Sequence, residues 1–217
     1  PAYYADWFFF FFWRGHLAWK NPFSGRVQYV SFAKTRAIVF WTKNPGPVLP
    51  LLSALDERGI AYYFQFTLND YGPEEFEPGL PLLEERIAVF RELSRRIGKE
   101  RVIWRFDPVL VTDRLGVDEL LLRIQNIGDR LAPFTEKLVF SFIDIARYAS
   151  VARHCAPHGI RELTDDEMAL IRDIARGMAA VEPQHKDAFE RNAKAYIDRL
   201  TALRDKMHAT LDPLPKS

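Results

Sequence analysis

The chain has 217 residues, of which 48% are hydrophobic, so it can bury one large core or one core with a small appendage. Its 30 Lys and Arg side chains balance 29 Asp and Glu, so net charge favours neither nucleic acid nor an anionic membrane as a partner, and only a local patch could attract either. A single cysteine, Cys155, excludes an internal disulfide framework and any metal or iron–sulfur site built only from cysteines of this chain.

The first feature along the chain is a run of seven aromatic residues, Trp7 to Trp13. Because a helix turns every 3.6 residues and a strand alternates its faces, these side chains cannot all face one core. The run is either an artefact of sequence assignment or an apolar docking surface for a protein partner or a second copy of the chain. It follows Asp6 and is shorter than the roughly 18 residues of a membrane helix, so we expect no signal peptide, no membrane anchor and a cytoplasmic location.

Short strands alternate with helices through the middle of the chain, the pattern of βαβ units around a parallel sheet. Two weak strands come first, Leu17 to Lys20 and Val27 to Phe32, joined through turn signals at Asn21-Pro22 and Ser24-Gly25. The clearer strands are Arg36 to Thr42, Ala61 to Leu68, Arg101 to Leu110 and Lys137 to Asp144. The helices predicted between them are Pro47 to Arg58, Pro81 to Ile97 and Val117 to Leu131.

After the last strand the sequence becomes helical. Thr164 and Glu167 form a capping-box pattern that opens a helix toward Ala180, and a second, charged helix is predicted from Pro183 to about Thr210. We therefore predict an incomplete parallel (β/α) barrel with C-terminal helices. Its domains would be an α/β barrel over residues 1–180 and a helical appendage over residues 181–217, although an ordinary C-terminal helix packed on the barrel fits the pattern too.

Each clear strand changes from apolar to polar residues at its C-terminal end, where the ligand sites of parallel α/β folds lie. Arg105 and Asp107 share one face of their strand, so they could clamp a carboxylate or phosphate, or form a purely structural pair that closes the barrel floor. Lys43 lies on a turn, where it could bind an anion, act as a base if it is buried, or simply be solvated. These three residues are the catalytic candidates, and the substrate-binding candidates are Asn44, Gln65, Thr67 and Asp144.

Two further clusters have plainer interpretations. His154, Cys155 and His158 are close in sequence and of types that bind zinc, but with no fourth ligand nearby we interpret them as a loop without metal. Glu74, Glu75 and Glu77 are expected to form a solvated acidic loop. For Asp144, a helix-capping role is the alternative to substrate binding.

Four segments resemble a bacterial family of unknown function, DUF1848, in the order and spacing of their motifs. They read TRAIVFWTKNPGPVLPLL, YYFQFTLNDYG, RVIWRFDPVLVTD and KLVFSFIDIARY, and the resemblance covers about residues 1–177. The opening PAYYADWF is similar to the start of family members, which place a strand ending in Arg-Arg-Thr-Asp-Ile before it. The resemblance therefore implies a barrel of the TIM or radical-SAM-like type, with that first strand missing from this chain.

The resemblance also implies cofactors for complete family members, a [4Fe–4S] cluster and S-adenosylmethionine, through a C-terminal C-x-x-x-C-x-x-C motif. None of those cysteines is present here, so we expect no cofactor in this chain. Residues 181–217 are similar instead to the long backbone helix of periplasmic zinc-binding proteins of metal transporters. The function implied is a truncated or divergent barrel that binds a small polar or anionic substrate without cluster activity. The alternative is a non-catalytic protein that docks a partner through Trp7 to Trp13 and the C-terminal helix.

Overall fold

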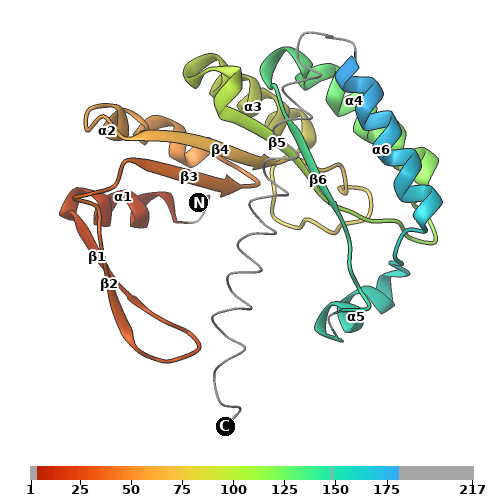
Figure 1. Cartoon of the computed structure of the whole chain (residues 1–217), viewed down its shortest axis with the longest axis horizontal. Coiled ribbons are helices and arrows are strands. Elements are labelled where there is room, and N and C mark those ends of the chain that lie inside the picture. The colour runs from red at the N-terminus through yellow and green to blue at the C-terminus, as the bar shows by residue number, and fades with distance from the viewer. Residues whose placement is uncertain (1–3, 148, 181–217) are drawn as a thin grey trace, which may run out of the picture. The chain divides into compact units, whose positions relative to one another are not determined.

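The computed structural model describes residues 4–147 and 149–180 as a mixed α/β structure (Figure 1). The chain forms two compact units that divide after Met168, and the sheet belongs to the first of them. The strands are β1 His16–Lys20, β2 Val27–Ser31, β3 Ala37–Thr42, β4 Ala61–Thr67, β5 Val102–Val109 and β6 Leu138–Phe142. The α-helices are α1 Ala5–Arg14, α2 Ser53–Asp56, α3 Leu83–Ile97, α4 Val117–Leu131, α5 Ala149–Cys155 and α6 Asp165–Ala180.

A four-stranded parallel sheet, in the order β3-β4-β5-β6, is the centre of the first unit. Its strands confirm the four clear strand predictions, with ends that differ by no more than two residues. In the described residues β3 and β6 are the outer strands, each paired with one neighbour. The α/β class and the parallel sheet are thus confirmed, whereas closure into a barrel stays a prediction.

One face of the sheet carries the aromatic core. Phe40, Phe64 and Phe66 alternate along β3 and β4, and each is at most 5% exposed. Helix α3 turns its apolar stripe toward this layer, and its Phe90 ring stacks on Phe66 with 5.2 Å between the ring centroids. The amphipathic pattern of α3 and α4 was sufficient to place both helices, because a period of 3.6 leaves only one face to bury.

The opposite face of the sheet is more polar and more exposed. Trp41, Gln65 and Ile103 are neighbours in register on β3, β4 and β5, and two residues further along, Thr67 pairs with Arg105. Because strand residues alternate between faces, these side chains share one face. Trp41 is 59% exposed, so this face is open beside β3.

The aromatic run forms helix α1, which divides its rings between core and surface. Phe9 and Phe12 are fully buried, whereas Trp7, Phe10 and Trp13 are 46%, 52% and 55% exposed. The helix ends at Gly15, whose φ of 79° suits a residue without a β-carbon. Strands β1 and β2 then pair as an antiparallel hairpin, which confirms both weak strand predictions.

Two helix predictions need comment. The segment from Pro47 to Arg58 is not one helix but a 3₁₀ turn, Gly46–Leu51, followed by the single turn α2, because Pro50 lacks the N–H that a continuous helix needs. The capping box at Thr164 is confirmed: the Thr164 N–H donates to Glu167 Oε2 at 2.8 Å, and the Glu167 N–H donates to Thr164 Oγ1 at 3.3 Å.

The predicted helix from Pro183 and the appendage over 181–217 lie outside the described residues. Among residues 4–147 and 149–180, no helix combines the length and the apolar character that crossing a lipid bilayer requires.

Candidate functional site

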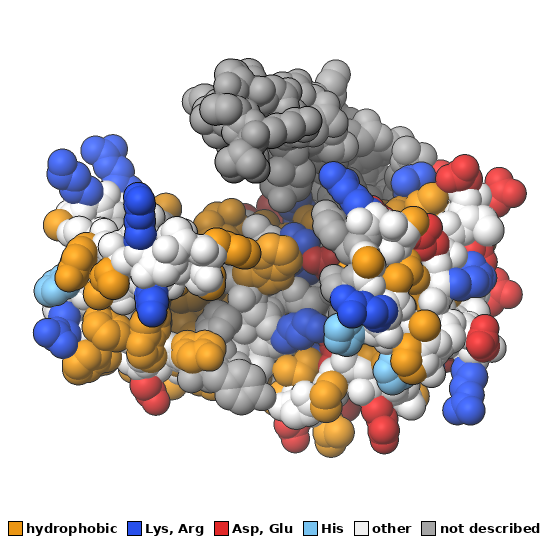
Figure 2. All heavy atoms as spheres, turned by 90° about the horizontal axis from the view of Figure 1, so that it is seen from below, with side chains coloured by type: hydrophobic (Ala, Val, Ile, Leu, Met, Phe, Trp, Pro, Cys, Tyr) orange, Lys and Arg blue, Asp and Glu red, His pale blue; other side chains and the backbone are white. Residues whose placement is uncertain are grey.

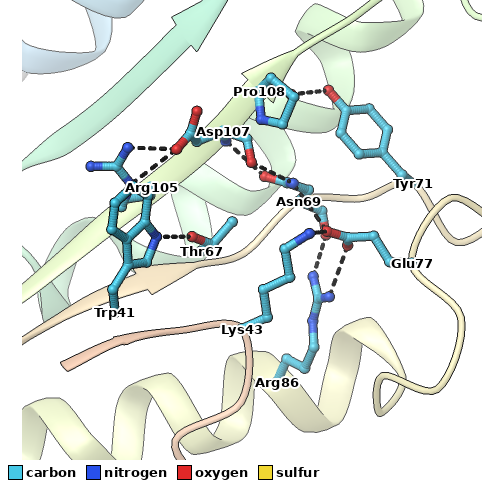
Figure 3. A network of polar contacts seen from close by, with 10 residues as sticks. All are labelled: Trp41, Lys43, Thr67, Asn69, Tyr71, Glu77, Arg86, Arg105, Asp107 and Pro108. Atoms are coloured by element: carbon cyan, nitrogen blue, oxygen red, sulfur yellow. Dashed lines mark hydrogen bonds and ion pairs between the residues drawn. The ribbon is translucent and has the colours of Figure 1, made fainter. Parts of the chain in front are cut away.

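A polar cluster centred on Arg105 lies toward the carboxyl ends of β3, β4 and β5 (Figure 3). The guanidinium donates from Nη2 to Asp107 Oδ2 at 2.5 Å and from Nε to the same oxygen at 3.2 Å. Its Nη1 donates to Gln65 Oε1 at 2.7 Å. Only 9% of the Arg105 side chain is exposed, so two neighbouring strands hold this cation almost rigidly.

The indole of Trp41 covers the Arg105 guanidinium, with its ring centroid 4.3 Å from Cζ. The indole is oriented in turn by Thr67, because Trp41 Nε1 donates to Thr67 Oγ1 at 3.1 Å. A cation over an aromatic face is stabilised by the ring quadrupole, most strongly for Trp. On the other side, the Ser141 hydroxyl of β6 donates to Asp107 Oδ1. The cluster thus draws on all four strands of the sheet.

A second cluster is centred on Glu77, in the loop between β4 and α3. Its carboxylate accepts hydrogen bonds from Lys43 Nζ at 2.6 Å, Arg86 Nη1 at 3.0 Å and Asn69 Nδ2 at 3.1 Å. Only 6% of the Glu77 side chain and 4% of the Arg86 side chain are exposed. Burial alone would raise the pKa of Glu77, but the hydrogen bonds and positive charges of Lys43 and Arg86 outweigh it and hold that pKa below its usual range.

Asn69 joins the two clusters. Its Oδ1 accepts the Asp107 N–H at 2.9 Å, and its Nδ2 donates to the Asp107 carbonyl at 3.1 Å, so its amide pairs with the backbone at the end of β5 as a neighbouring strand would. Arg86 Nη2 also donates to the Asn69 carbonyl. The nearby Tyr71 hydroxyl donates to the Pro108 carbonyl at 2.8 Å and accepts the Leu110 N–H at 3.2 Å. Burial raises the pKa of Tyr71 above its ordinary value, which keeps this donor protonated.

The charges of the joined clusters do not cancel. Three cations, Lys43, Arg86 and Arg105, face two carboxylates, Glu77 and Asp107, so the formal sum is one positive charge. The Arg86 side chain is buried, whereas the Lys43 side chain is 44% exposed to solvent. Lys43 is therefore the cation of this network that is presented to solvent, at the edge where parallel folds bind ligands.

The structure brings together five of the seven residues that the sequence singled out, namely Lys43, Gln65, Thr67, Arg105 and Asp107. The other two shape turns. Asn44 Oδ1 accepts the Gly46 N–H at 3.0 Å, and Asp144 Oδ1 accepts the Arg147 N–H at 3.1 Å. The latter is the local backbone bonding that was the alternative for Asp144.

The expectation of a solvated acidic loop is wrong for Glu77 and Glu74. Glu77 is buried as described, and Glu74, 13% exposed in its side chain, bonds to Arg123 at 2.9 Å. Sequence reasoning also missed Asn69 and Arg86. A signal for Arg86 existed, because it falls on the apolar stripe of α3, one residue before the buried Ile87. A charged residue on a buried stripe indicates a paired or functional ion.

An iron–sulfur cluster does not fit the residues of this chain. A [4Fe–4S] cluster on a radical-SAM-like site needs three thiolates, and the chain's one cysteine, Cys155, is buried. The neighbouring His158 packs its ring edge-on against Phe76, with centroids 5.4 Å apart. Among residues 4–147 and 149–180, no three His, Cys, Asp or Glu side chains gather as a metal site would require. No chemical step is therefore assigned to such a cluster.

Comparison with known protein families identifies the family of this chain. The family model described as "Domain of unknown function (DUF1848)" matches residues 1–199, most of the chain. No curated protein and no solved structure matches it significantly.

Proposed function

Because the chain belongs to the DUF1848 family, whose description names no activity, we propose its function from the site geometry: it binds a small anionic molecule at the carboxyl edge of its sheet. The observation that carries this proposal is the convergence of Lys43 and Arg105 at one edge, with one positive charge left over after Glu77 and Asp107 are counted.

The two cations suit different parts of anion recognition. Arg105 is fixed by Asp107, Gln65 and the ring of Trp41, so its remaining N–H directions are set before a ligand arrives. A planar guanidinium recognises a carboxylate or phosphate by charge-assisted hydrogen bonds of defined direction. Lys43 is half-exposed on a flexible stem, so it can turn from Glu77 toward the ligand. Binding is favoured when one donor is already fixed, because fewer side chains lose conformational freedom as the ligand binds.

The carboxylate of Asp107 gives the site a second kind of contact. It already accepts from Arg105 and Ser141, and its side chain is 15% exposed. A ligand hydroxyl or ammonium group could donate to its accessible side, which favours a small molecule that carries both an anionic group and a hydrogen-bond donor. We assign Arg105, Asp107 and Lys43 to substrate recognition in any reaction that this edge performs.

The test is ligand-induced stabilisation. The melting temperature is measured with inorganic phosphate, acetate and a hydroxycarboxylate, for the unmodified chain, Lys43→Gln and Arg105→Lys. Binding to the folded state raises the melting temperature as ligand concentration rises above the dissociation constant. We expect a rise for the unmodified chain and a smaller or absent rise for both variants.

The matched control is Arg130→Gln, which removes a cation of α4 that pairs with exposed Glu84 away from the site. It should keep the full ligand response. The proposal is wrong if no anion stabilises the unmodified chain, or if Lys43→Gln and Arg130→Gln respond alike.

A second candidate function rests on helix α1. Trp7, Phe10 and Trp13 recur every three residues and stay about half exposed. Trp7 also lines a groove of about 330 Å³ that is bordered by α1 and β3. Exposed apolar surface of this kind is typical of protein docking sites. Size-exclusion chromatography with light scattering tests it: a dimer that Trp7→Ser and Phe10→Ser convert to monomer supports docking of a second copy, and a monomer at every concentration excludes that form.

A further inference from the structure

The overall balance of charge hides a strongly basic segment. Between Trp7 and Leu55 the sequence carries no Asp or Glu, but it carries Arg14, Lys20, Arg26, Lys34, Arg36 and Lys43. The first five are exposed, and in the part of the chain that the structure describes no carboxylate forms an ion pair with them. Figure 2 shows basic and hydrophobic side chains gathered on the left, where Figure 1 places α1 and the β1–β2 hairpin. This is the local patch that the net charge conceals.

The hairpin presents apolar side chains to solvent on both of its faces and at its tip. Phe23, in the loop at its tip, is 97% exposed, and Tyr29 and Val27 are 78% and 56% exposed. The register pairs Ala18 with Tyr29 and Trp19 with Gln28, so Tyr29 and Trp19 point to opposite faces of the ribbon. Trp19 is 43% exposed. Figure 1 shows the hairpin extending away from the sheet, with its loop at the far end.

The loop at the tip satisfies its own backbone donors. Asn21 Oδ1 accepts the N–H groups of Phe23 and Ser24, at 2.8 and 3.2 Å, and the Asn21 carbonyl accepts the Gly25 N–H at 2.9 Å. The Arg26 N–H donates to Ser24 Oγ at 3.4 Å, and the Asn21 N–H donates to the Arg26 carbonyl at 2.9 Å. Pro22 has no N–H to satisfy. A loop whose donors are bonded internally can leave water at little cost in unpaired polar groups.

We propose that the tip of the β1–β2 hairpin docks this protein on the surface of an anionic lipid bilayer. Phe23 would enter the interface between headgroups and acyl chains, Trp19 and Tyr29 would lie at headgroup level, and Lys20 and Arg26 would face the lipid phosphates. Aromatic rings with a polar edge favour that level of a bilayer, and basic side chains near an anionic leaflet strengthen binding.

The other occupants fit these observations less well. A second copy would bring the same positive charge against itself, since the segment has no acidic side chain to offer. Single-stranded nucleic acid stacks its bases on aromatic rings along one groove, whereas Trp19 and Tyr29 lie on opposite faces. A bilayer interface surrounds the inserted tip, so it accepts apolar groups on every side.

The test is binding of the full chain to vesicles of equal parts phosphatidylglycerol and phosphatidylcholine, by co-sedimentation. We expect binding that weakens as salt is raised and that is much weaker on phosphatidylcholine alone. Phe23→Ser should weaken binding by roughly tenfold or more, and Lys20→Glu with Arg26→Glu by at least roughly thirtyfold. Because these side chains are exposed, the variants should melt at the temperature of the unmodified chain.

The control variant carries Lys99→Glu and Arg114→Glu, which changes the net charge equally but away from the hairpin, and it should bind almost normally. Insertion is read from an environment-sensitive dye on Ser24→Cys, whose emission should shift to the blue on anionic vesicles, while the same dye on Ser53→Cys should not shift. The proposal is overturned if Phe23→Ser binds like the unmodified chain, if both charge variants weaken binding equally, or if a single-stranded oligothymidylate binds the hairpin and anionic vesicles do not.

Discussion

Replacing Glu77 with Gln should destabilise the fold sharply, because Glu77 is the only carboxylate within reach of Arg86 among the ion pairs of the described residues. The substitution keeps the shape of the side chain and removes its charge. Arg86, 4% exposed in its side chain, would then remain as a buried cation with no ion-pair partner among the described residues, and its Nε already has no hydrogen-bond partner there. Breaking a buried pair in this way costs about 3–5 kcal/mol.

Gln can still accept one hydrogen bond, so we place the loss for Glu77→Gln near the lower end of that range, about 3 kcal/mol. With a urea dependence of about 2 kcal/mol per molar, the midpoint of unfolding would fall by about 1.5 M. The matched control is Glu84→Gln, which also breaks an Arg–Glu pair, with Arg130, but Glu84 is 71% exposed in its side chain. Its midpoint should barely move.

The dependence on pH supplies a second measure. The pKa of Glu77 is lower in the folded protein than in the unfolded chain, where it is about 4.3. The stability that its charge contributes is therefore fully present above about pH 4.3 and is lost as pH falls through the lower folded value. The difference between the unmodified chain and Glu77→Gln should be constant between about pH 6 and 8 and should shrink in acid. Equal midpoints for Glu77→Gln and Glu84→Gln at neutral pH would refute the burial of this pair.

Three further predictions follow from burial and capping. Arg105→Ala should lower the free energy of unfolding by about 3–5 kcal/mol, because Asp107 loses its ion-pair partner. Lys43→Ala leaves Glu77 with two donors and should lower it by about 1 kcal/mol. Equal urea midpoints for the two variants would contradict the burial of the Arg105–Asp107 pair. Phe12→Ala should lower the free energy of unfolding by about 3–5 kcal/mol, whereas Phe10→Ala, on the exposed face of α1, should lower it by less than about 0.5 kcal/mol. If calorimetry ranks the two variants in the opposite order, a different face of α1 is buried. Thr164→Ala should cost about 1 kcal/mol through loss of the cap, visible as a lower midpoint that Thr164→Ser largely restores.

The strands could be predicted because their signal is local. Buried parallel strands read as nearly continuous apolar runs, and polar residues follow AIVFWT directly and YYFQFT after Leu68, so the carboxyl ends of these strands could be predicted to within one residue. Closure of the sheet is a different matter. Closure depends on whether the edge strands of the sheet pair with further strands or with each other, and the residue pattern within a strand does not predict that pairing.

The candidate site was predictable in part for the same reason. Period-two alternation placed Gln65 with Thr67 on one face of their strand and Arg105 with Asp107 on one face of theirs, and the structure brings the two pairs together. Glu77 and Asn69 could not be found this way, because they lie after β4 in a segment without periodicity. Their position is set by long-range contacts, such as the bond between Asn69 and the backbone of Asp107, which the local sequence does not specify.

The buried part of the network bears on why the site lies where it does. A buried ion pair is weak evidence for stability, since apolar side chains of similar volume often stabilise a core as well or better. Arg86 and Glu77 are therefore better explained by what they support. One oxygen of Glu77 accepts from Arg86 and the other accepts from Lys43 and Asn69. Asn69 in turn holds the backbone of Asp107, whose carboxylate binds Arg105. The buried pair of Arg86 and Glu77 thus helps to position Lys43 and, through Asn69 and Asp107, Arg105. An apolar pair of the same volume could not do so.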